Sequence, residues 1–250
     1  MKTSPIIQKP LTRRDIISLA EDIIIEYVKE KGWNRVEDFK LDLQELYEYV
    51  IYPRYEYQLI QSEDLGYKEN EKVLGKVISN DRVILIDRSI SPPNFDARFT
   101  FTLGHEFGHG VLHPGSKEHF RCSSKDILGS AIIDEREVQA NCFSEHLVMP
   151  NNLVLELIKL CYHPDKPFIY IGQGEYCFDV FGKNVLKKIG SYTEFCRMLA
   201  WPLTGFFSDI SRLSLGLKIH KLGIISNRTQ EKFSISNTRY GGTPKIGQVV

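Results

Sequence analysis

The sequence lacks the long apolar segments that mark membrane and secreted proteins. No hydrophobic run approaches the roughly 18 residues that a membrane-spanning helix needs. The first ten residues, MKTSPIIQKP, have no apolar centre of the kind found in a secretory signal. We therefore expect a cytoplasmic protein that does not contact a membrane.

Cysteine is scarce and is not spaced for covalent or metal cross-links. The cysteines are an odd number without any CxxC pair, and they are Cys122, Cys142, Cys161, Cys177 and Cys196. This pattern argues against a disulfide framework and against a zinc ribbon built from thiolates. We expect all of these thiols to be reduced.

The chain has no net charge, but its charges are unevenly distributed. Its 250 residues, 42% hydrophobic and 26% charged, are ordinary for a globular protein with one large domain or two smaller ones. From Gly205 to the end, the sequence contains seven Lys or Arg and only two Asp or Glu. This segment therefore carries a formal charge of +5 and the remainder of the chain −5. Such asymmetry suits a nucleic-acid or acidic partner, although a solvated basic face is its commoner cause.

The motif His105-Glu106-x-x-His109 stands inside the apolar stretch FTFTLGHEFGHGVLHP at 99–114. On a helix, residues four apart differ by about 40° and about 6 Å of rise, so the two imidazoles can share a metal. Glu106 lies roughly 100° round the helix, where it can reach a water bound to that metal. The alternative is a core helix whose histidines bond to backbone groups or carboxylates.

An open zinc site needs a third protein ligand. The metzincin pattern HExxHxxGxxH fails here, because Leu112 and Gly115 occupy its glycine and histidine positions. A second helix is predicted for 134–150, DEREVQANCFSEHLVMP, where Glu137 and Asn141 share a face. His113 continues the face of His109, but a span of about 12 Å from His105 is too long for one ion, so we interpret His113 as an outer or structural residue.

Together, 98–114 and 137–150 resemble the ImmA/IrrE family of metallopeptidases, in which these blocks typically read FTLAHELGHxxLH and ExEANxFAxxLLMP. The resemblance covers roughly residues 15–165. It implies that His105, His109 and Glu137 are the metal ligands and that Glu106 is the catalytic glutamate. The departures are glycine in place of alanine at 104, glutamine in place of glutamate at 139 and serine in place of alanine at 144.

The N-terminal half is predicted to supply helices and then strands. Thr12 and Asp15 suggest a capping box on a helix that ends at Gly32, followed by a helix over 41–49 and a strand over 55–60. Strands over 72–79 and 82–87 are joined by Asn80-Asp81 as a hairpin. We nominate 83–86 as a strand that docks a substrate, and the alternative is an internal strand with no free edge.

Around the metal helix, Asn94 or Asp96 is expected to cap its start and 114–131 to form a loop beside the cleft. A helix over 152–160 follows, whereas 162–191 shows no clear pattern. Residues 195–226 suggest two helices around a turn, similar to the helix-turn-helix tail of many relatives. Its basic residues Arg212, Lys218 and Lys221 would allow DNA contact, but we favour packing or partner recognition.

The predicted fold is therefore α+β: a zincin-like peptidase domain with a small antiparallel sheet over an HExxH helix, then a mainly helical, helix-turn-helix-like region. The expected divisions are 11–165 for the peptidase domain, 166–226 for the helical region and 227–250 for a polar tail.

The leading functional hypothesis is a zinc-dependent endopeptidase, with Mn²⁺ as the alternative ion and Glu106 as the proton-transfer residue. The resemblance implies a specific protein substrate, a helix-turn-helix repressor cleaved in a stress or mobile-element response. The competing hypothesis is a regulatory module that senses metal or binds protein or DNA with little peptidase activity. A purely structural zinc site is disfavoured, because such sites usually have four protein ligands.

Overall fold

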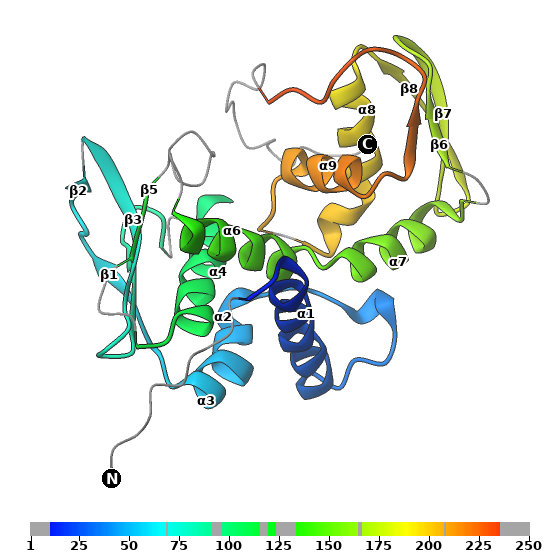
Figure 1. Ribbon diagram of the computed structural model, residues 1–250. Helices are drawn as coiled ribbons and strands as arrows, with labels where there is room; N and C mark the ends of the chain where they lie inside the picture. Colours follow the sequence, from blue (N-terminus) through cyan, green and yellow to red (C-terminus); the bar gives the residue numbers. More distant parts are fainter. Residues whose placement is uncertain are drawn as a thin grey trace, which may run out of the picture.

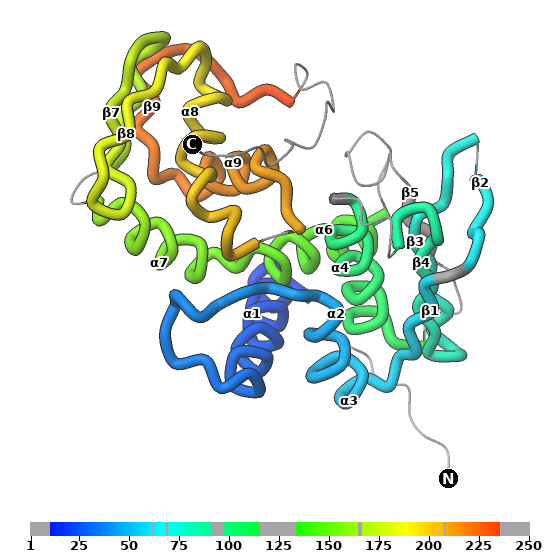
Figure 2. The backbone as a smooth tube through the Cα atoms, turned by 180° about the vertical axis from the view of Figure 1, so that it is seen from behind, coloured from blue at the N-terminus to red at the C-terminus, as the bar shows by residue number. Residues whose placement is uncertain are grey.

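The computed structural model describes residues 11–68, 70–91, 97–115, 120–123, 134–164, 167–207 and 209–235. A sheet lies at one end of the molecule and the C-terminal region at the other, with helices α4 (Ala97–Leu112) and α6 (Glu135–Val148) between them (Figure 1). The view from behind shows the same arrangement (Figure 2). No helix among the described residues is long and apolar enough to cross a membrane.

Helix α1 (Arg13–Glu30) begins at the predicted capping box, in which Thr12 and Asp15 bond reciprocally. Its apolar face is buried, and it packs on α6. A 3₁₀ turn, η1 (Val36–Asp38), follows.

The next helical segment runs further than its sequence indicates. It comprises α2 (Leu43–Leu46), the π-helical turn η2 (Tyr47–Ile51) and α3 (Tyr52–Tyr55). Glu56 then adopts a left-handed conformation with φ 57°, which ends the helix. The strand predicted from residue 55 therefore begins later, as β1 (Gln58–Glu63).

The sheet also contains β2 (Tyr67–Lys68), β3 (Glu71–Ile78), β4 (Val83–Asp87) and β5 (Phe120–Ser123). Its order is β1-β4-β3-β2, and β5 also pairs with β3. The predicted hairpin is confirmed as the antiparallel β3–β4 pair, but β1 runs parallel to β4. The sheet is therefore mixed, and the prediction of an antiparallel sheet is wrong in this respect.

Strand β4 lies inside the sheet, hydrogen-bonded to β1 on one side and to β3 on the other. The nomination of 83–86 as a docking strand is therefore wrong, because both backbone edges are already occupied. The alternative, an internal strand, is confirmed. Strand β5 lies within the loop predicted for 114–131, and the remainder of that loop after Gly115 lies outside the described residues, as do Asn94 and Asp96.

The predicted ligand helix is confirmed as α6, and the helix predicted for 152–160 as α7 (Asn151–Tyr162). Beyond it come strands β6 (Phe168–Tyr170), β7 (Gly174–Val180) and β8 (Lys183–Ile189). Helix α8 (Tyr192–Ala200), the 3₁₀ turn η3 (Trp201–Gly205), α9 (Arg212–Lys221) and β9 (Ile225–Asn227) complete the described chain. The region is thus a mixture of helices and strands, which corrects the mainly helical prediction.

The helix-turn-helix interpretation is not confirmed. Helices α8 and α9 pack together, but residues 201–211 separate them, whereas a helix-turn-helix uses a turn of about three to four residues. Two of the basic residues proposed for DNA contact point to the protein instead, because Lys218 and Lys221 both pair with Glu145 on α6. Lys218 is only 2% exposed.

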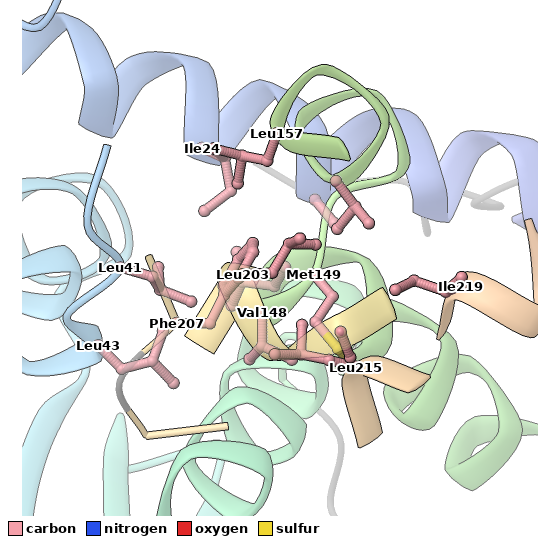
Figure 3. Close-up of a cluster of buried hydrophobic side chains, with 14 of the residues drawn as sticks. Ile24, Leu41, Leu43, Val148, Met149, Leu157, Leu203, Phe207, Leu215 and Ile219 are labelled. Atoms are coloured by element: carbon pink, nitrogen blue, oxygen red, sulfur yellow. The ribbon is translucent and has the colours of Figure 1, made fainter. Parts of the chain in front are cut away.

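One buried apolar cluster packs the N-terminal half of the chain against the C-terminal region (Figure 3). It brings residues of the N-terminal half and of α6 and α7 against residues of η3, α9 and their connection. The labelled members are Ile24, Leu41, Leu43, Val148, Met149, Leu157, Leu203, Phe207, Leu215 and Ile219. The C-terminal region and the helices of the N-terminal half therefore share a core.

Candidate active site

Helix α4 places the three motif residues in the interior of the protein. His105, Glu106 and His109 are all 0% exposed. The Nε2 atoms of His105 and His109 lie 3.0 Å apart, with the two rings edge to face. This is the arrangement that the i, i+4 spacing predicts for two ligands of one ion.

Helix α6 brings the carboxylate of Glu137 to the same point. Its Oε2 lies 3.1 Å from Nε2 of His105, and its Oε1 lies 3.4 Å from Nε2 of His109. One ligand atom from each of the three residues lies within 4.8 Å of the others, the only such group of three or more potential metal-binding residues in the described chain. The structure thus brings together the residues that the resemblance identified.

Asn141 makes this group suitable for a divalent cation. Its Oδ1 lies 2.9 Å from Nδ1 of His105, and an amide oxygen only accepts, so we assign the proton to Nδ1. The lone pair on Nε2 of His105 then faces the Glu137 carboxylate, which is itself an acceptor. Two acceptors at this distance call for a cation between them, and two imidazoles with one carboxylate are an established donor set for catalytic zinc.

The protonation states also suit a metal site. Burial lowers the pKa of His109 to about 4, although Glu137 opposes this shift. Burial would raise the pKa of the Glu137 carboxyl, but His105 and His109 outweigh it and hold that pKa well below its usual range. Near neutral pH, His109 is therefore neutral and Glu137 ionised, as metal ligands must be.

His113 lies outside this group. Its ring centroid is 5.6 Å from that of His109, and its side chain hydrogen-bonds the backbone of Arg136. This contact ties the end of α4 to the start of α6, next to Glu137. The geometry agrees with the interpretation of His113 as an outer, structural residue.

Gly75 on β3 is a site residue that the sequence analysis missed. A Cβ at this position would lie 2.8 Å from Cγ of Glu106 and 2.8 Å from Cγ2 of Thr102, and closer still to Oε1 of Glu106. The strand therefore rests directly on the Glu106 side chain, and only glycine leaves room for it. A glycine inside a strand pattern is the available signal, since it often marks a close approach of this kind.

Comparison with known protein families matches residues 61–169 to the IrrE N-terminal-like domain, Peptidase_M78. No curated protein matches the chain. The matched segment begins after the first helices and ends within β6, and it contains His105, Glu106, His109 and Glu137. Residues 61–169 are therefore an IrrE N-terminal-like domain of the metallopeptidase family Peptidase_M78, and the resemblance to ImmA/IrrE proteins is confirmed.

Proposed function

We propose that this protein is a zinc-dependent endopeptidase that hydrolyses a peptide bond in a specific protein, a helix-turn-helix transcriptional repressor, in a stress or mobile-element response. The convergence of His105, His109 and Glu137 in one buried group beside Glu106 carries the catalytic part of the proposal. The repressor substrate is supported by the family resemblance.

His105, His109 and Glu137 would hold the ion, and Asn141 would keep His105 in the tautomer that presents Nε2. A bound divalent ion supplies Lewis-acid chemistry, because it lowers the pKa of water towards about 7 and polarises a carbonyl oxygen. Mn²⁺ is the alternative occupant of the same donors.

Glu106 performs the proton transfers. It accepts a proton from the attacking water as the new C–O bond forms on the peptide carbon. It then donates this proton to the amide nitrogen as the C–N bond breaks, which releases a carboxylic acid and an amine. At neutral pH the acid passes its remaining proton to the amine, so the products separate as a carboxylate and an ammonium group. The β3 backbone at Gly75 restricts the Glu106 side chain from one side, which limits the positions that its carboxylate can take.

The test combines metal analysis with cleavage. The wild type, Glu106→Gln and Glu137→Ala are purified, their zinc and manganese contents are measured, and each is incubated with candidate helix-turn-helix repressors and analysed by mass spectrometry. We expect Glu106→Gln to keep the metal and lose cleavage, and Glu137→Ala to lose both. Glu135→Gln, an exposed carboxylate two residues from Glu137, is the matched control and should keep both.

The regulatory hypothesis makes the opposite prediction. If the wild type and Glu106→Gln bind metal and control the partner protein equally well, the protein works by binding and not by hydrolysis. If the wild type binds neither zinc nor manganese after reconstitution, the peptidase proposal fails.

A further inference from the structure

Helices α4 and α6 run antiparallel, and a series of contacts connects them. Glu137 meets the two histidines, Asn141 bonds His105, and Ser144 donates a hydrogen bond of 3.0 Å from Oγ to the Phe101 carbonyl. In a regular helix, the Phe101 carbonyl also accepts from the N–H of His105, four residues later. Ser144 therefore attaches to α4 at the turn that carries the first histidine.

Small residues allow this close approach. A Cβ at Gly108 would lie 3.1 Å from both Cα and O of Ala140. A Cβ at Gly104 would lie 2.8 Å from Oγ of Ser144 and 3.2 Å from Cγ1 of Val148. The space above Gly104 is thus filled by the Ser144 hydroxyl, which uses that space to reach the Phe101 carbonyl.

We propose that Gly104 and Ser144 form a coupled positioning pair that sets the spacing of α6 on α4 and thereby places Glu137 against His105 and His109. The inference rests on the proposed metal site. Neither residue touches the ligand atoms in this arrangement, so both act through the helix that carries Glu137. The pair also explains two of the three departures from the family pattern together. Gly104 is smaller than the usual alanine and Ser144 is larger than the usual alanine, so the first makes room for the second.

The distances predict how the two positions depend on each other. Alanine at 104 opposite serine would force the Ser144 hydroxyl or the whole of α6 to move. With alanine at both positions, the nearest backbone-fixed atom is Cβ of residue 144 at 3.6 Å, an ordinary contact, and Val148 can adjust by rotating. The double variant should therefore fit where the single Gly104→Ala variant does not.

The experiment is a double-mutant cycle read out by Zn²⁺ affinity, measured by competition with a chromogenic chelator. It compares the wild type, Gly104→Ala, Ser144→Ala and the double variant. We expect Gly104→Ala to weaken Zn²⁺ binding by about 10-fold or more, the range seen when groups behind a ligand are disturbed. In the Ser144→Ala background, the same Gly104→Ala change should have an effect of less than about 3-fold, because the collision is gone.

Thermal unfolding of the metal-free variants separates positioning from general stability. A purely structural role would lower the unfolding temperature of Gly104→Ala and leave Zn²⁺ affinity unchanged, which would overturn the proposal. Equal Gly104→Ala effects in the serine and alanine backgrounds would also overturn it. Ser18→Ala, exposed on α1, and Gly174→Ala, which has no atom within 4 Å of the added Cβ, are the matched controls. Failure of the wild type to bind Zn²⁺ would instead refute the proposed function, and the inference with it.

Discussion

The contact between Gly75 and Glu106 predicts that one added methyl group will destabilise the protein. In Gly75→Ala, the new Cβ would lie 2.8 Å from Cγ of Glu106 and from Cγ2 of Thr102. Carbon atoms pack best at about 3.5–4.0 Å, so this overlap forces side chains or backbone to shift. Overpacking of this kind costs about 1–3 kcal/mol.

For a chain of this length, such a loss lowers the unfolding temperature by about 2–4 °C per kcal/mol, or about 2–12 °C in total. The predicted loss of stability in Gly75→Ala has the opposite sign to the usual effect of such an exchange. Replacing glycine by alanine inside a strand normally stabilises a protein by about 0.5–1 kcal/mol. Gly174→Ala on β7, where the added Cβ meets nothing within 4 Å, should show this ordinary behaviour and serves as the control.

The assay is urea unfolding of the wild type, Gly75→Ala, Glu106→Ala and the double variant, all without metal. Glu106→Ala removes two of the three colliding atoms and leaves Thr102, so Gly75→Ala should cost at least about 1 kcal/mol less in that background. Equal costs in both backgrounds would refute the reasoning, because they would show that β3 does not press on Glu106.

Three further predictions concern the surroundings of the site. Glu145→Gln should destabilise the protein by about 3 kcal/mol in urea unfolding at pH 7, because it leaves the buried Lys218 without its carboxylate. Lys218→Met, which removes the buried charge itself, should be neutral or stabilising. Equal losses of stability in the two variants would contradict this prediction. Burial opposes ionisation of Glu145, but Lys221 and Lys218 hold its pKa below the ordinary 4.5. Its contribution to stability is therefore present above pH 4.5 and is lost as the pH falls through the lower folded-state pKa. The stability difference between wild type and Glu145→Gln should shrink as the pH is lowered from 4.5, and a constant difference would argue against it. Asn141→Ala should weaken Zn²⁺ binding about 10-fold in the chelator assay, because His105 loses the acceptor that fixes its tautomer, and unchanged affinity would exclude that role.

The grouping of the candidate site residues could be predicted from the sequence because it depends largely on local spacing. His105 and His109 share a helix, and four residues of separation fix their relative position. Glu137 required a second helix, which the sequence predicts over 134–150 and which the structure describes as Glu135–Val148. The capping box of α1 and the β3–β4 hairpin were predictable for the same reason, since each depends on residues close together in the chain.

Contacts between distant segments were not predictable in this way. No local pattern indicates that β1 pairs with β4 in parallel or that Gly75 lies on Glu106. The β7–β8 hairpin was missed because its turn, Phe181-Gly182, is not one of the common turn dipeptides, yet both residues have positive φ, 52° and 74°. The sequence did not indicate that Lys218 and Lys221 of α9 pair with Glu145, because that residue lies far away in the chain, on α6.

The buried cluster of Figure 3 shows that the C-terminal region covers apolar side chains of α6 and α7. The family match ends at residue 169, but the cluster continues through Leu203, Phe207, Leu215 and Ile219. A fragment cut at the end of the match would expose the apolar side chains of α6 and α7 to water, including Val148 and Met149 at the end of the helix that carries Glu137. The unit that sequence similarity defines is thus smaller than the unit that shares one buried core, because the apolar side chains of α6 and α7 pack on residues that lie beyond the family match.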